Sequence, residues 1–166
     1  IHFVTHSLGG ILVRQLADMD SQLKIGRVVM LAPPNKGSEV AEALSHWACF
    51  RALNGPAGEQ LGTSAKSLPN SLGAAPFQLG IIAGNRTINP LLSSLIKGES
   101  DGRISVENTK LEGMADFIVL PVSHPLIMLN RRVAEQTLYF LLHGRFKRLP
   151  NHDMMNQSSK NLEERS

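Results

Sequence analysis

Three side chains of this sequence are of the types that build a serine nucleophile: Ser7, Asp101 and His124, in that order along the chain. A serine hydroxyl is a poor nucleophile unless a base takes its proton and a third group orients that base. Ser7 lies in the segment 5–10, Thr-His-Ser-Leu-Gly-Gly, between an apolar run and a helical pattern. The order of strand, serine and helix predicts a nucleophile elbow, a tight turn that holds the serine in a strained conformation.

The context of the serine carries this prediction, because a Ser-x-Gly tripeptide alone is weak. A second such tripeptide, at 71–73, follows a Pro-Asn pair instead of a strand. Around Ser7, the small Gly9 suits the tight turn, and Gly10 lets the helix pack close to the strand. Thr5 stands where the turn normally has a glycine, so we expect its side chain to crowd the turn.

His124 is the best candidate for the base, because it follows the apolar run 117–123 and precedes a helix opened by Pro125. Open α/β sheets place their sites just past the carboxyl ends of the strands. The alternative role for His124 is a capping or buried structural histidine. The remaining histidines are less well placed: His2 and His6 on the first strand, with His6 expected to point away from the serine, His46 in a long excursion, His143 at a helix end and His152 in the tail.

Asp101 is the best candidate for the group that orients the base. It lies in the turn 98–102, between the third and fourth predicted strands, and Gly102 follows it. Its carboxylate would hold the imidazole in one tautomer and stabilise the imidazolium that forms. The alternative is an ordinary Asp-Gly turn. Other carboxylates could replace it: Glu99 is the nearest substitute, and Glu107 and Glu112 are weaker ones.

Four short apolar runs predict the strands that position these residues. They are Ile1–Val4, Arg27–Ala32, Phe77–Ala83 and Asp116–Val122. Several are continuous in valine, isoleucine and leucine, as is typical of parallel strands covered on both faces. Helical patterns follow the first and the last of these runs. One has an apolar face formed by Leu8, Ile11, Leu12, Leu16 and Met19, and the other runs from Leu126 to His143. The alternation predicts an α/β fold, a mostly parallel sheet covered by helices.

Residues 38–75 form a long excursion between the second and third strands. A helix from Glu39 to Leu53 is expected to open it, followed by a segment rich in glycine, serine and proline. Excursions of this length are often functional, so we expect a lid-like segment within a partial domain over 1–149. Its apolar residues could face an acyl group or simply belong to the core: Trp47, Phe50, Leu53, Leu61, Leu68 and Leu72. Residues 150–166 are expected to form a polar, loosely ordered tail.

Composition excludes several classes of function. The formal charge is +3, from 17 basic and 14 acidic residues, which is too small an excess to indicate nucleic-acid binding. Cys49 is the one cysteine, so no internal disulfide can form, and a cytoplasmic setting is slightly favoured. No apolar run approaches membrane-spanning length. We find no closely spaced ligand set for a metal and expect no cofactor.

Taken together, these residues resemble the α/β-hydrolase superfamily, and within it the lipase- and esterase-like bacterial serine hydrolases. The similar segments, spread over residues 1–146, are 5–10, 30–38 (Met-Leu-Ala-Pro-Pro-Asn-Lys-Gly-Ser), 100–102 and 123–125. The resemblance implies hydrolysis of small-molecule or lipid esters through an acyl-enzyme. It makes Ser7 the nucleophile, His124 the base and Asp101 the acid, with the Leu8 backbone N–H donating to the oxyanion.

The same resemblance implies that the part normally preceding the elbow is lacking. That part supplies the second oxyanion donor, whose loss costs on the order of a hundredfold or more in rate. It also covers the edge of the elbow strand, so we expect a homo-oligomer formed through that exposed edge. Two alternatives stay open. One is an impaired, hydrolase-derived fragment that acts in assembly or binding, and the other is an acyltransferase or thioesterase with the same triad.

Overall fold

A four-stranded parallel sheet forms the centre of the computed structural model, which describes residues 1–40, 63–64, 67–88 and 96–148. The strands lie side by side in chain order, each parallel to the next. They are β1 (Phe3–His6), β2 (Arg27–Leu31), β3 (Gln78–Gly84) and β4 (Met114–Leu120). The predicted parallel α/β fold is confirmed, with strand ends displaced by up to two residues.

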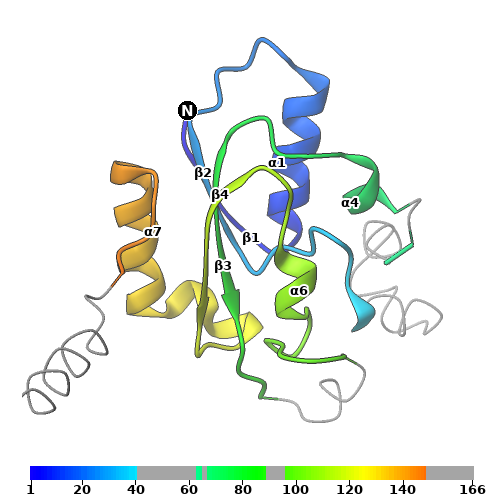
Figure 1. The fold of residues 1–166 in the computed structure, drawn as a ribbon, viewed down its shortest axis with the longest axis vertical. Coiled ribbons are helices and arrows are strands. Elements are labelled where there is room, and N and C mark those ends of the chain that lie inside the picture. Colours follow the sequence, from blue (N-terminus) through cyan, green and yellow to red (C-terminus); the bar gives the residue numbers. More distant parts are fainter. Residues whose placement is uncertain (41–62, 65–66, 89–95, 149–166) are drawn as a thin grey trace, which may run out of the picture.

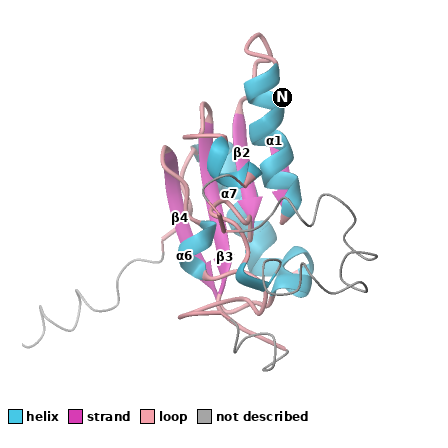
Figure 2. Cartoon of the chain, turned by 90° about the vertical axis from the view of Figure 1, so that its right-hand side faces the viewer, coloured by secondary structure: helices cyan, strands magenta, loops and turns pink. Residues whose placement is uncertain are grey.

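Helices cover both faces of this sheet, giving three layers (Figures 1 and 2). One face carries α1, α4 and α6, and the other carries α7 (Figure 1). Their bounds are α1 (Leu8–Met19), α4 (Leu68–Ser71), α6 (Val106–Thr109) and α7 (Arg131–His143), with a 3-10 helix, η1 (His124–Leu129), leading into α7.

Strand β2 shows why the sheet is buried on both faces. Successive side chains of a strand point to opposite faces. Val28 and Met30 accordingly pack with Leu79 of β3 on the α1 face, whereas Val29 and Leu31 belong to the cluster on the α7 face. The continuous apolar sequence of this strand therefore supplies side chains to the hydrophobic clusters on both faces of the sheet.

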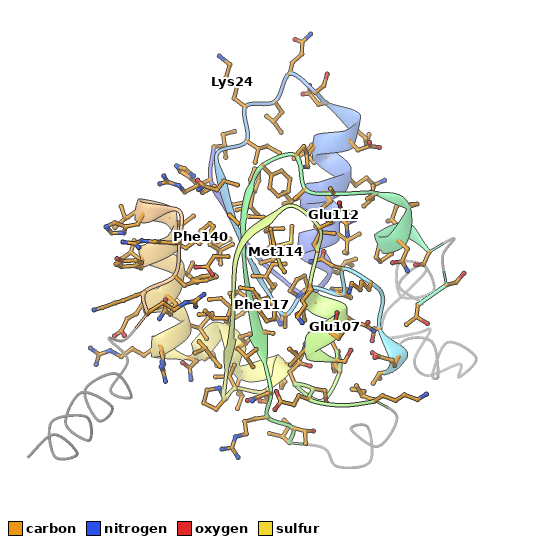
Figure 3. All side chains as sticks on the ribbon, in the orientation of Figure 1. Lys24, Glu107, Glu112, Met114, Phe117 and Phe140 are labelled. Atoms are coloured by element: carbon orange, nitrogen blue, oxygen red, sulfur yellow. The ribbon has the colours of Figure 1, made fainter. Side chains whose placement is uncertain are left out.

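Phe140 of α7 anchors the second of these cores and packs directly onto the sheet (Figure 3). It is fully buried, and its ring meets the ring of Phe146 at 4.9 Å between centroids. The sheet admits it because β3 has Gly80 at the contact, where an added Cβ would lie 2.6 Å from the Phe140 ring. Any side chain at this position would push α7 away from the strands.

The predicted apolar face of α1 is wrong in part. Ile11 is buried, but Leu12, Leu16 and Met19 are 54%, 39% and 78% exposed. The helix instead turns Gly10, Val13, Arg14 and Ala17 inward. Close approach explains the difference, because a Cβ on Gly10 would lie 3.0 Å from the Met30 sulfur. The close approach at Gly10 therefore turns the face around Val13 and Arg14 inward and leaves Leu12, Leu16 and Met19 outside.

The single helix predicted from Leu126 to His143 is wrong as well. A 3-10 turn, η1, comes first, and α7 begins after Asn130. The Asn130 side-chain oxygen accepts hydrogen bonds from the N–H groups of Arg132 and Val133. Asparagine is a strong N-cap because it satisfies donors that have no partner inside the helix. This cap gives α7 its own start and separates it from the segment that follows His124.

Most of the predicted excursion at 38–75, including nearly all of the expected helix 39–53, lies outside the described residues. So do the tail beyond residue 149 and Cys49. Within the described part of the excursion, α4 is the one helix whose first and last residues are both described. No helix in the described ranges is long and apolar enough to cross a membrane.

Candidate active site

The loops that follow three of the four strands bring the three predicted site residues together. Ser7 comes directly after β1, Asp101 lies in the connection between β3 and β4, and His124 comes four residues after β4. The carboxyl ends of parallel strands lie at one edge of a sheet, so residues that follow them can meet. In the structure these three side chains form one series of hydrogen bonds.

Ser7 occupies a sharp turn between β1 and α1. Its φ of 52° and ψ of −123° lie in a region that side-chain-bearing residues rarely adopt. The turn is held by the Ser7 N–H, which donates to the Leu31 carbonyl at 2.9 Å. Gly9 explains how Thr5 is accommodated, because a Cβ at Gly9 would lie 3.3 Å from the Thr5 Cβ. One side chain fits between these two positions, and here Thr5 supplies it.

His124 lies between the other two side chains. Its Nε2 is 3.1 Å from the Ser7 Oγ, and its Nδ1 is 2.7 Å from the Asp101 Oδ2. An ionised carboxylate only accepts hydrogen bonds, so the Nδ1 carries the hydrogen. The Nε2 of the neutral ring is then free to accept the hydrogen of the Ser7 hydroxyl. His124 is 4% exposed, so the protein shields most of this contact from water.

Asp101 is held rigidly by its own turn. Its Oδ1 accepts hydrogen bonds from the N–H groups of Arg103 and Ile104, both at 2.9 Å. The carboxylate is 1% exposed, and its second oxygen faces His124. Space for this arrangement comes from Gly84, where a Cβ would lie 2.9 Å from the Asp101 Cβ. The two oxygens therefore have separate tasks: one fixes the turn, and the other holds the imidazole.

A buried polar cluster secures the loop after β2, which belongs to the segment 30–38. Arg14 of α1 donates to the Asn35 side chain at 3.2 Å and to the Gly73 carbonyl at 2.8 Å. Asn35 in turn donates to the Thr109 carbonyl at 2.8 Å. Burial lowers the pKa of the Arg14 guanidinium. The cluster ties the elbow helix to this loop. Arg14 lies outside the apolar face predicted for this helix, and the periodicity of the sequence did not mark it as buried.

His6 is a site neighbour that the sequence did not predict. It was expected to point away, yet its Nε2 lies 3.1 Å from the backbone oxygen of His124. The two imidazole rings are 4.8 Å apart between centroids. A strand residue next to an elbow has no strict alternation to follow, because the chain turns sharply at Ser7.

The other candidates lie elsewhere or have other partners. Glu107 pairs with Lys36 and Lys110, at 3.0 Å and 2.7 Å, and both lysines lower its pKa. Glu99 and Glu112 are exposed. The hydroxyl of Ser71 donates to the Leu68 carbonyl. His2 accepts from the Arg27 N–H, and His143 contacts the Tyr139 carbonyl at the end of α7. His46 and His152 lie outside the described residues.

The arrangement offers acid–base and nucleophilic chemistry. Over the described ranges, no three His, Cys, Asp or Glu side chains gather as ligands for a metal. The Leu8 N–H opens α1, and the first N–H groups of a helix have no partner within it. Such a helix start attracts negative charge. A negatively charged oxygen formed beside Ser7 would thus meet a favourable field.

Comparison with known proteins bears on the fold. No protein-family model matches the sequence, and no curated protein does. Among solved structures, the chain resembles the Bacillus licheniformis lipase BlEst2 in its propeptide form, with a TM-score of 0.66 and 16% identity over 92% of this chain and 37% of that one. The mature form of that lipase gives a TM-score of 0.62 and 20% identity over 87% and 65% of the two chains.

A second enzyme shows the same likeness. The phospholipase PlaB from Legionella pneumophila gives a TM-score of 0.58 and 18% identity over 97% of this chain and 45% of that one. The chain therefore spans between 37% and 65% of the length of these neighbours. At such identities the likeness establishes the fold alone. The chain thus has the α/β fold of bacterial lipases and esterases.

Proposed function

We propose that this chain is a serine hydrolase of the α/β-hydrolase type that cleaves carboxylic esters through an acyl-enzyme. The observation that carries the proposal is the series of hydrogen bonds from Asp101 through His124 to Ser7, at 2.7 Å and 3.1 Å. The strained turn at Ser7 supports it, because strain of this kind is stored where function needs it. The lipase and the phospholipase that share the fold are consistent with small-molecule or lipid esters as substrates.

The geometry supports the following reaction. His124 Nε2 takes the hydroxyl proton as the Ser7 Oγ attacks the ester carbonyl carbon. The imidazolium that forms faces the Asp101 carboxylate, and the carbonyl oxygen, now negative, faces the Leu8 N–H. His124 then gives its proton to the alcohol oxygen as the bond between carbon and that oxygen breaks. Water attacks the acyl-enzyme by the same sequence of steps and frees the acid and Ser7.

A rate measurement with a chromogenic ester tests this proposal. We expect p-nitrophenyl butyrate to release p-nitrophenol in a burst of one equivalent per chain, followed by a slower steady rate, when deacylation is the slow step. A butyryl adduct should then be found on the protein by mass spectrometry after an acid quench. Absence of the adduct, with turnover that equals the rate in buffer, would contradict the proposal.

The acyl acceptor decides between hydrolysis and the alternative of acyl transfer. The acyl-enzyme is common to both, so product analysis must separate them. With an alcohol or a thiol present beside water, a hydrolase gives mainly the free acid. A transferase gives mainly the new ester or thioester, and hydrolysis of a thioester substrate would favour a thioesterase.

The rate of either reaction also depends on a second N–H donor to the negatively charged oxygen, beside the Leu8 N–H. Losing one such donor costs about 10²- to 10³-fold in kcat.

A second candidate function, assembly or binding, is favoured by the surface around β1. This strand lies at the end of the sheet order, so one of its edges has no neighbouring strand among the described residues. Val4 on it is 50% exposed and lines an apolar groove that reaches Met128 and Leu138 of η1 and α7. Unpaired strand edges beside apolar side chains are templates for association. The expected homo-oligomer through this edge stays a prediction.

Substituting Val4 with lysine tests that prediction. The parent chain is expected to run as a dimer or larger species in size-exclusion chromatography with light scattering. Val4→Lys is expected to move it towards the monomer, because a lysine charge at a strand edge opposes pairing. Val4→Thr, which keeps the branched shape without the charge, serves as the control. A parent chain that is monomeric at all concentrations would contradict association through this edge.

A further inference from the structure

His6 makes a contact that the reaction described above does not use. It is the last residue of β1, directly before Ser7, and its Nε2 lies 3.1 Å from the backbone oxygen of His124. A carbonyl oxygen can only accept a hydrogen bond, so in this contact the Nε2 must carry the hydrogen. This fixes the tautomer of the neutral His6 ring: Nε2 carries the hydrogen, and Nδ1 carries none.

This bond adds to the contacts that hold His124 in place. The backbone N–H of His124 donates to the Asp101 carbonyl at 3.0 Å, and its backbone oxygen accepts from His6. Its two ring nitrogens contact Asp101 and Ser7. Asp101 therefore secures one side of the residue, and the segment containing His6 and Ser7 secures the other. Without His6, the backbone oxygen of His124 would lose the donor that comes from the elbow strand.

The charge state of His6 suits this position. Burial lowers its pKa from the ordinary value of 6.5, and the neighbouring His124 lowers it further. The hydrogen bond to the His124 backbone oxygen and the carboxylate of Asp101 act against this lowering, whereas Arg103 acts in the same direction. His6 is therefore neutral around pH 7. A neutral ring 4.8 Å from the His124 ring does not oppose the positive charge that the base acquires when it takes a proton.

We propose that His6 is a positioning residue for His124: its donated hydrogen bond sets the main chain of the base so that Nε2 faces the Ser7 hydroxyl. This inference rests on the proposed hydrolase function, because it assigns a task within that site. A misplacement of the base by about 1 Å can slow such chemistry by about 10²-fold.

Two substitutions separate the hydrogen bond from the bulk of the ring. His6→Phe keeps a ring of similar size and removes the donor, whereas His6→Gln places an amide N–H near the position of the Nε2. The rate of inactivation by an alkyl fluorophosphonate is measured for each. We expect about a tenfold loss for His6→Phe, the scale of one well-placed hydrogen bond, and a rate within about threefold of the parent for His6→Gln. Equal rates for all three chains, or a His6→Gln chain as slow as His6→Phe, would overturn the proposal.

A second measurement does not depend on turnover. The proton on His124 Nδ1, bonded to Asp101 at 2.7 Å, should give a strongly deshielded resonance in a proton NMR spectrum. We expect this resonance in the parent and in His6→Gln, and its loss to exchange with water in His6→Phe. If the fluorophosphonate does not label the parent chain at all, the proposed function is wrong. The NMR resonance then tests by itself whether His6 positions His124. If labelling and the resonance both survive in His6→Phe, the function stands and the positioning role is wrong.

Discussion

Replacing Ser7 with alanine is expected to lower the rate of ester hydrolysis by at least about 10³-fold and to leave only the small residual rate that substrate binding and oxyanion contacts supply. The hydroxyl is the one group that the proposed mechanism bonds to the acyl carbon, so no neighbour can take its place. The hydrogen bond between His124 Nδ1 and Asp101 Oδ2 does not involve Ser7, so we expect it to remain in this variant. Steady-state release of p-nitrophenol, with folding checked by circular dichroism, measures the effect.

Ser71 provides a matched control within the same chain. It also belongs to a Ser-x-Gly tripeptide, but it is exposed and lies in α4, with its hydroxyl bonded to the Leu68 carbonyl. Ser71→Ala is therefore expected to leave the rate unchanged. If Ser7→Ala keeps the parent rate, or if Ser71→Ala loses it, the elbow is not the site of the reaction.

Asp101→Asn is expected to lower the rate of hydrolysis by about 10³- to 10⁴-fold. The Oδ1 of residue 101 accepts from two backbone N–H groups, so the amide oxygen of asparagine will take that position. The NH₂ group then faces His124 Nδ1, which must give up its hydrogen to accept this donor. The hydrogen moves to Nε2, and the ring can no longer take the proton of Ser7.

Glu99 gives the matched control for this substitution. It lies two residues away and is exposed, so Glu99→Gln makes the same chemical change without touching the imidazole. We expect this variant to hydrolyse esters at the parent rate. An Asp101→Asn chain that is folded and retains more than about a tenth of the parent rate would show that His124 does not depend on this carboxylate.

The fold and the meeting of three side chains could be predicted from the sequence because both follow from local order along the chain. Each candidate follows a strand, and parallel strands end at one edge, so Ser7, Asp101 and His124 had to lie near one another. The strands could be predicted from continuous apolar runs, which also follow from local order along the chain. A strand such as β2, covered on both faces, has no polar side to interrupt it.

Features that depend on close packing could not be predicted in this way. The inward face of α1 is set by how near the helix comes to Met30, which periodicity alone does not encode. The contact between His6 and His124 joins residues that are 118 positions apart and depends on the turn at Ser7. Likewise, the start of α7 depends on the geometry of the Asn130 cap, and the helical pattern runs through it.

Covalent labelling tests the central claim most directly. A fluorophosphonate carries a phosphorus atom that an activated serine oxygen attacks, with loss of fluoride, so the adduct marks the nucleophile itself. We predict one adduct per chain, located on Ser7 by mass spectrometry of the peptides, and none in a folded His124→Ala chain. An adduct on any other serine, or equal labelling of Ser7 in the His124→Ala chain, would contradict a nucleophile activated by His124.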